Sequence, residues 1–281
     1  MTSNVPYKGQ HTAKLPSPKV WGQFPVKQAS CMVGGEYRVA DFRDAIGALA
    51  TPDATVISGD VRLASSAAAD TDIKRSLGDG SPVLDWTPAD GEDLVVGPQI
   101  VFDIGAGRPW AYEARVAIVT AVKHSMFAGL ATLAGNTSIT TYDAYTAAYI
   151  LADGGAQYGD RGLIGFHKHE TLATIFASIK DRGTADNAGY QINGTSAAIE
   201  SGATISAVKT LVDATFVKLG MYSDGRVIRW FVDNAEVASL EMGHGELPSG
   251  GYESSMVPVL VLNASHATLA QVSWVACGYV S

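Results

Sequence analysis

The chain has 281 residues and a mass of 29.4 kDa, with 47% hydrophobic residues, 30 glycines and only 17% charged residues. This composition favours a turn-rich β protein with a sizeable core over a helical one. The 20 basic and 28 acidic residues give a net charge of −8. An acidic balance disfavours a nucleic-acid or anionic-membrane partner, because phosphate groups are bound by clustered Lys and Arg.

Targeting signals and cysteine chemistry are sparse. No run of about 18 apolar residues is present, so we expect no membrane-spanning segment. The N-terminus lacks the apolar stretch of a signal peptide, which predicts a protein made in a cytosol. Cys31 and Cys277 are too few for a disulfide framework or a four-cysteine zinc site, and we expect reduced, buried thiols. Whether the two cysteines lie close in space is left open.

The first 30 residues have the composition of an extended arm. Prolines recur through this stretch and predict that it forms no helix. Its aromatic residues Tyr7, Trp21 and Phe24 predict that the arm docks, either on a partner or across its own domain. We place an N-terminal arm with short strands at residues 1–60 and a β-sandwich at residues 61–281. Residues 43–54 suggest a helical turn, and residues 64–83 suggest a surface loop.

Short strands follow one another from residue 92 onward, interrupted at residues 140–159, where the tyrosine spacing suggests a short helix. Within residues 110–118, Ala114, Val116 and Ile118 alternate with Glu113 and Arg115, so apolar and charged side chains face opposite sides. The final strand ends at the C-terminus. This pattern predicts an all-β fold, an antiparallel β-sandwich or jelly roll.

Residues 216–242 carry the most regular alternation in the chain. Asp224-Gly225 and Asp233-Asn234 are turn signals, because their residue types tolerate positive φ. They predict a three-stranded antiparallel meander. Six alternating residues are expected to form its inner, core layer: Val217, Leu219, Met221, Ile228, Trp230 and Val232.

Several of these strand motifs occur together in a known order. The stretches "WAYEARVAI", "SMFAGLATLA", "DRGLIGFHKHE", "TFVKLGMYSDGRVIRWFVDNAEVASLEM", "MVPVLVLNAS" and "ATLAQVSWVACGYVS" resemble the concanavalin-like (laminin-G-like) jelly-roll module of tailed-bacteriophage structural proteins. The resemblance covers about residues 98–281. At one turn the chain departs from it, since Asn234 is followed by Ala235 where the module usually has Gly.

The resemblance implies a virion protein, and specifically a decoration or cement protein on the capsid exterior. The implied partner is the major capsid protein, a homotrimer fits the three-fold sites of capsid lattices, and Tyr7, Trp21 and Phe24 become candidate capsid contacts. A glycan-binding module of a phage fibre or tail is the alternative, with Tyr252 in a glycine-rich loop as its candidate contact. Trp230 and Trp274 alternate with apolar residues and are expected in the core rather than on a glycan platform.

No set of residues with the spacing of a catalytic site is recognisable in the sequence. His167 and His169, with Glu170, could supply part of a metal site on one strand face, but no third ligand is identifiable, and we expect no metal and no cofactor. His244 and Glu246 lie in a glycine-rich loop. Glu236 and Glu241 stand on opposite faces of one strand, so they do not form the carboxylate pair of a glycosidase. No Gly-x-Ser-x-Gly nucleophile motif occurs, and we predict no catalytic residue.

Overall fold

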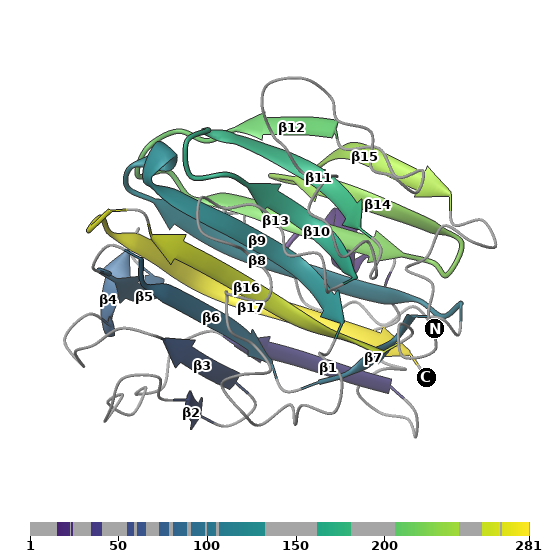
Figure 1. Ribbon diagram of the computed structural model, residues 1–281. Helices are drawn as coiled ribbons and strands as arrows, with labels where there is room; N and C mark the ends of the chain where they lie inside the picture. Colours follow the sequence, from purple (N-terminus) through teal and green to yellow (C-terminus); the bar gives the residue numbers. More distant parts are fainter. Residues whose placement is uncertain are drawn as a thin grey trace.

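The computed structural model describes residues 16–22, 24, 35–40, 55–58, 61–65, 73–78, 81–88, 91–98, 100–104, 107–132, 162–180, 206–241, 255–264 and 266–280. In these residues strands dominate, and they form two antiparallel sheets stacked face to face (Figure 1). The fold class predicted from the sequence, an antiparallel β-sandwich, is confirmed. No helix in the described ranges is long and apolar enough to span a membrane.

We call the two sheets sheet A and sheet B. Sheet A has the strand order β15 (Ala235–Glu241), β14 (Val227–Val232), β13 (Val217–Ser223), β8 (Trp110–Ile118), β17 (Ala270–Val280), β5 (Ser81–Trp86) and β4 (Ile73–Gly78), and β1 (Gly35–Ala40) also pairs with β17. Sheet B has the order β12 (Ser206–Thr210), β11 (Thr174–Lys180), β10 (Leu163–Lys168), β9 (His124–Thr132), β16 (Ser255–Ala264), β6 (Asp93–Pro98), β3 (Val61–Ser65) and β2 (Thr55–Ser58), and β7 (Phe102–Asp103) also pairs with β16. Two short helical turns complete the described elements, α1 (Pro18–Trp21) and the 3-10 turn η3 (Ala121–Lys123).

The predicted meander is present as β13, β14 and β15. Its second turn consists of Asp233 and Asn234, whose φ angles are 49° and 73°. Positive φ at both central residues is the pattern of a type I′ hairpin turn, which matches the twist of the flanking strands. Ala235 already pairs with Val232 as the first residue of β15, so this position does not need the Gly found in the resembling module.

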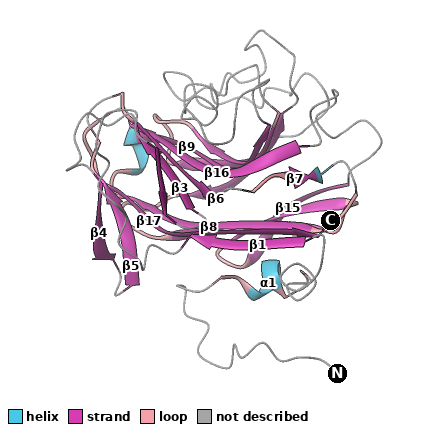
Figure 2. Ribbon diagram, turned by 90° about the horizontal axis from the view of Figure 1, so that it is seen from below, coloured by secondary structure: helices cyan, strands magenta, loops and turns pink. Residues whose placement is uncertain are grey.

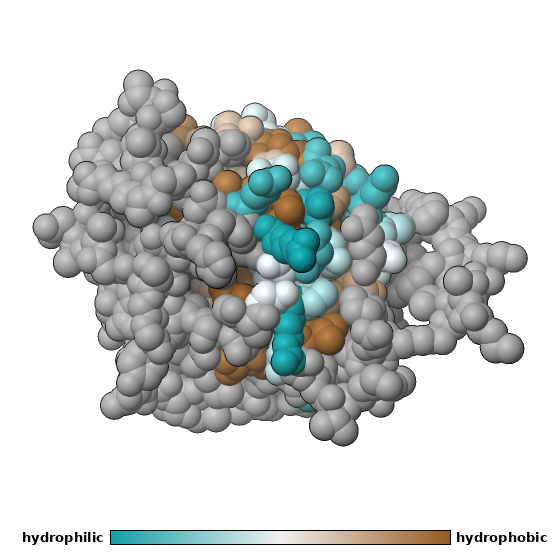
Figure 3. Space-filling view, turned by 90° about the vertical axis from the view of Figure 1, so that its right-hand side faces the viewer, coloured by the Kyte–Doolittle hydropathy of each residue, from teal (hydrophilic) through white to brown (hydrophobic). Residues whose placement is uncertain are grey.

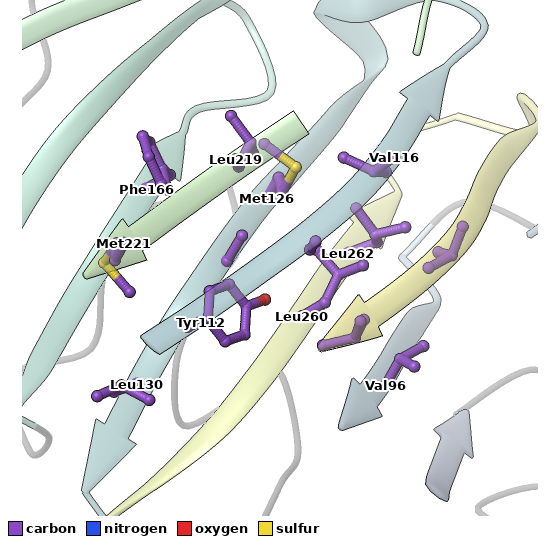
Figure 4. Packing of buried hydrophobic residues seen from close by; sticks show 14 of the residues in the cluster. Val96, Tyr112, Val116, Met126, Leu130, Phe166, Leu219, Met221, Leu260 and Leu262 are labelled. Atoms are coloured by element: carbon purple, nitrogen blue, oxygen red, sulfur yellow. The ribbon is translucent and has the colours of Figure 1, made fainter. Parts of the chain in front are cut away.

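The core lies between the two sheets and draws side chains from both (Figure 4). All six residues expected in the inner layer of the meander are buried there. Hydrogen bonds between described residues also cross the core: the Trp230 indole donates to the Gly165 carbonyl at 3.1 Å, and the Tyr112 hydroxyl donates to the Val259 carbonyl at 2.9 Å. Because a buried indole or phenol needs a partner, these bonds fix sheet A against sheet B.

Two expectations for residues 31–83 do not hold. The surface loop expected at residues 64–83 contains β4 and the start of β5, which pair in register from Ile73 with Trp86 to Gly78 with Ser81. The two residues between the strands are Asp79-Gly80, a hairpin dipeptide that the polar composition of this stretch obscured. β1 pairs with β17 and β2 pairs with β3, so the sandwich begins before residue 61.

The expectation that the prolines exclude a helix is wrong at Pro18–Trp21, which form one helical turn. Ser17 is its N-cap, and the Ser17 hydroxyl accepts a hydrogen bond from the Lys19 amide at 3.3 Å. Pro18 occupies the first helical position, where a missing amide hydrogen costs nothing and the fixed φ is favourable. The described part of the arm is therefore locally ordered rather than fully extended.

The predictions for residues 43–54 and 140–159, and those for Tyr7, Cys31, His244, Glu246 and Tyr252, concern residues outside the described ranges.

Candidate functional site

The centre of the outer face of sheet B is mostly apolar. Phe127 and Ala131 of β9, Leu163 of β10 and Val259 and Val261 of β16 point away from the core and are nevertheless buried. The described strands β9, β10 and β16 contain no acidic residue. A jelly-roll glycosidase needs two facing carboxylates, and the centre of this described face supplies none.

The outer face of sheet A is different, because it carries a buried row of charged side chains. Glu113 and Arg115 alternate along β8, and Lys218 lies beside them on β13, which pairs with β8. Arg115 donates a hydrogen bond to the Ser273 hydroxyl at 3.2 Å, and its guanidinium lies 4.0 Å from the centre of the Phe216 ring. Charged groups are buried only where hydrogen bonds or opposite charges compensate the lost hydration. This row therefore needs the partners that surround it.

The N-terminal segment, which we define as residues 16–22 and 24, docks on this face. Figure 2 shows α1 on the side of sheet A that faces away from sheet B. The Ser17 amide and the Trp21 indole both donate to Oε2 of Glu113, each at 2.8 Å. Val20 and Phe24 are buried against Ala111, Tyr222 and Phe231 in a small second core, partly covered by Trp21, Tyr37 and Val280. The segment thus combines two hydrogen bonds to one carboxylate with an apolar contact.

Gly220 belongs to this site because the side chains of Val20 and Glu113 lie close to its Cα. A Cβ atom on Gly220 would lie 2.7 Å from Cγ2 of Val20 and 3.3 Å from Cγ of Glu113. Contacts that short require the neighbouring side chains to shift, so glycine lets the valine at position 20 pack directly on β13. We call Ala111, Glu113, Gly220, Tyr222 and Phe231 the docking face.

Glu113 has the most perturbed acid chemistry of the docking face. Its side chain is 1% exposed, and burial raises its pKa from 4.5 to about 7. The two hydrogen bonds from the segment and the positive charge of Lys218 oppose this shift without overcoming it. The neutral acid can keep Oε2 as the acceptor of both bonds, because its proton can reside on Oε1. Glu113 can thus accept both hydrogen bonds from the segment in either protonation state, and the two donors themselves favour its ionised form.

Lys218 connects the docking face to the turn between β14 and β15. Its ammonium donates to Oδ1 of Asn234 at 2.7 Å, and its amide donates to Oδ1 of Asp233 at 3.0 Å. Burial lowers the pKa of Lys218, opposed by the charges of Glu113 and Asp233. The turn residues therefore hold both the backbone and the ammonium of Lys218 beside the row.

A second buried ionisable group lies at the end of β10. Lys168 is buried, and its ammonium donates to the carbonyls of His124 and His169. Burial lowers the pKa of Lys168 to about 7, and burial together with the nearby Lys168 charge lowers the pKa of His124 to about 4. His124 also meets the Thr268 hydroxyl at 3.1 Å and packs edge-on against Trp86. Sequence reasoning missed this cluster, because the alternation of β10 predicts an apolar side chain at position 168.

The structure places two of the three candidate arm contacts on the chain's own sheet. Phe24 is buried and Trp21 is half-buried, with its indole bonded to Glu113. Trp21 also packs edge-on against Phe24 and Tyr37, with ring centres 5.7 and 5.2 Å apart. Of the two docking modes predicted for the arm, these residues adopt contact with their own domain.

The candidate metal ligands do not share a strand face. His167 is the buried outer-face residue of β10, whereas His169 follows the strand and meets the Thr171 hydroxyl at 2.8 Å. Within the described residues, no group of three or more His, Cys, Asp or Glu side chains could hold a metal ion. Glu236 and Glu241 are exposed on β15, an edge strand of sheet A.

Trp274 was expected to share the core face of Val272. A bulge in β17 between Val272 and Trp274 shifts the register, and Trp274 pairs with Arg115 instead. An extra residue in one strand turns the following side chains to the other face. Trp274 is thus buried, but outside the main core cluster that contains Val272, Val275 and Cys277. Trp110 and Trp230 belong to that cluster.

Hydrophilic residues gather on the end of the sandwich that holds the turn between β13 and β14 (Figure 3). Asp224 and Arg226 are exposed in this turn. Oδ1 of Asp224 accepts from the amides of Arg226 and Val227, both at 2.9 Å, and Oδ2 accepts from Arg229 at 3.2 Å. Hydrogen bonds from these groups lower the pKa of Asp224. The residues stabilise a hairpin turn, and no ligand chemistry follows from them.

No family model and no curated protein matches the chain. Among solved structures, the carbohydrate recognition domain of Emp46p is 10% identical, with 78% of this chain and 87% of that chain covered and a TM-score of 0.45. A glycoside hydrolase family 16 endo-glucanase from Bacteroides ovatus is 9% identical, with 85% and 99% covered and a TM-score of 0.49. A carbohydrate esterase from the Shiga toxin-encoding bacteriophage phi24B is 8% identical, with 78% and 90% covered and a TM-score of 0.40. None of the three carries a substrate, reaction or partner over to this chain.

Proposed function

We propose that this protein is a non-enzymatic structural protein of a tailed-phage particle, a decoration or cement protein that binds the lattice of the major capsid protein from outside. The observation that carries the proposal is the docked N-terminal segment. Ser17 and Trp21 bond to Glu113, so the segment to which residues 1–15 are joined is held on sheet A. An arm rooted on a rigid body can spread contacts over neighbouring subunits.

The described sheet faces support a binding rather than a catalytic role. On sheet B the central strands present buried apolar side chains without carboxylates, and on sheet A the one carboxylate at the centre, Glu113, is occupied by the chain's own segment. The net charge of −8 suits the outside of a particle filled with nucleic acid. The proposal includes the homotrimer that three-fold lattice sites favour, synthesis in the cytoplasm of the bacterial host, and no membrane or nucleic-acid partner.

The copy number in purified particles from the source tests this proposal, measured by quantitative mass spectrometry against the major capsid protein. A decoration protein is expected in a simple ratio to the capsid subunit. A few copies per particle, together with binding on a glycan array, would replace the proposal with the alternative, a glycan-binding module of a fibre or tail. Complete absence from the particles would contradict both.

The arm is tested by deleting residues 1–15, which spares the docked residues from Ser17 onward. The truncated protein is expected to melt like the full chain and to lose attachment to particles. Deletion of residues 1–30 is less informative, because it also uncovers Ala111, Tyr222 and Phe231. Full-affinity attachment of the shorter deletion would show that residues 1–15 are not the capsid ligand.

A further inference from the structure

The contact between the N-terminal segment and the docking face is self-contained. The segment contributes two donors, from Ser17 and Trp21, and two buried apolar side chains, Val20 and Phe24. The face contributes the Glu113 carboxylate and the space above Gly220. Each half is complementary to the other in shape, in hydrogen bonding and in apolar area, as in the binding of a peptide to a receptor.

The segment depends on the face for its structure. Its helix is a single turn of four residues, which is far shorter than isolated helices that persist in water. The face depends on the segment in the same way, because undocking exposes apolar side chains of Ala111, Tyr222 and Phe231 and leaves Glu113 without its two donors. Any arrangement in which each docking face holds an N-terminal segment is therefore favoured over one in which the two are separated.

The chain connection permits more than one such arrangement. Residues 25–34 separate Phe24 from β1, which begins at Gly35. Ten residues can span roughly 35 Å when extended. A segment joined by this length of chain can reach its own docking face or that of an adjacent molecule.

We propose that the docking face also accepts the N-terminal segment of a second copy of this chain, so that neighbouring copies exchange segments when they are crowded. Exchange keeps the two Glu113 hydrogen bonds, the Val20 contact with Gly220 and the Trp21 contact with Tyr37, now made between molecules. Its main cost is the entropy of association, which falls as the local concentration rises. The role of exchange in tying copies together on a particle rests on the proposed function, whereas docking in trans does not.

A disulfide between the two halves distinguishes docking within a chain from docking between chains. The full chain carries Val20→Cys and Gly220→Cys, in a Cys31→Ser background, with Cys277 retained because it is buried. The 2.7 Å between Cγ2 of Val20 and a Cβ at position 220 brings the two Cβ atoms within disulfide range. The protein is equilibrated from low micromolar to about 1 mM, a concentration typical of tethered neighbours. It is then oxidised, and its products are separated on a non-reducing gel.

Exchange predicts both intrachain and interchain disulfides, with a ratio of interchain to intrachain product that rises about tenfold for each tenfold rise in concentration. A Val122→Cys variant, whose residue is 43% exposed, measures random crosslinking. An intrachain product alone, or interchain product no greater than that of the control at every concentration, overturns the proposal. Absence of both products overturns it as well, because the two halves would then not meet. None of these results depends on particles, so failure here and failure of the proposed function are separate outcomes.

Discussion

Residues at the centre of both outer faces are buried, but those on sheet B are mostly apolar and those on sheet A are charged. On sheet B the outward residues of β9, β10 and β16 are mostly apolar, with Val259 and Phe127 at the centre. On sheet A the corresponding centre holds Glu113, Arg115 and Lys218, and a short segment of the chain supplies hydrogen bonds to the carboxylate. An apolar face needs only to be removed from water, whereas a charged face needs specific partners. The second kind of face is therefore selective and sensitive to pH.

Because both sheets contribute to one core, they are expected to unfold together. Replacement of Trp230 is the strongest test of this expectation. Trp230→Ala removes a large buried side chain and its hydrogen bond to Gly165, and should lower the free energy of unfolding by about 3–5 kcal/mol. Chemical denaturation followed by circular dichroism should still show one transition. Trp230→Phe, which keeps most of the apolar volume, should cost less. Two separate transitions would mean that the sheets, and their outer faces, unfold independently.

The charged face predicts a stability that depends on pH through Glu113. Burial raises the pKa of this group from 4.5 to about 7, so the folded chain holds the proton more strongly than the unfolded chain. The resulting stabilisation is complete below about pH 4.5, declines as the pH rises and is lost above about pH 7, over a range of about 3 kcal/mol. The measurement is the free energy of unfolding of the wild type minus that of Glu113→Gln at each pH. This difference removes the titrations of Lys168 and His124, and a flat difference would contradict the assigned burial.

A smaller and local effect is expected on the segment itself. Val20→Ala removes two buried methyl groups above Gly220, which should weaken docking by about 1–2 kcal/mol while the sandwich stays folded. Hydrogen exchange at the amides of Trp21 and Gly22, which bond to carbonyls of Ser17 and Pro18, should accelerate accordingly. The matched control is Val122→Ala at an exposed valine. Equal acceleration across the strands in the Val20 variant would mean that the segment is part of the global folding unit.

The parts of the fold that follow from local periodicity could be predicted from the sequence, namely the strands of the meander and the side chains that face the core. The alternation and turn residues of β13–β15 gave the six core residues, because each side chain's face follows from its own neighbours. Trp274 was misplaced because one extra residue in β17 reverses the alternation, and single bulges leave little trace in a sequence. β4 was missed because its polar residues resemble a loop.

The docking face was beyond local reasoning for a different reason. Glu113 and Arg115 alternate with core residues as solvated side chains do, and their burial depends on contacts with residues distant in the chain, including Ser17. One local signal was available, since Ser17 followed by Pro18 is a helix-start pattern. It predicts the helical turn but not the surface on which the turn docks.

The smallest predicted effects distinguish the two outer faces most directly. The same type of substitution, a buried serine replaced by alanine, should change the free energy of unfolding in opposite directions on the two sheets. On sheet A the Ser273 hydroxyl accepts from buried Arg115, so Ser273→Ala should cost about 1–2 kcal/mol by removing a hydrogen-bond acceptor from a buried guanidinium. On sheet B the Ser178 hydroxyl is buried and, among the described residues, has no hydrogen-bond partner. Ser178→Ala should therefore be neutral or stabilising by up to about 1 kcal/mol, since it removes a desolvated polar group without orphaning another. Thermal unfolding of the two variants at one pH measures both changes. Equal losses would mean that the two faces do not differ in how their polar groups are satisfied.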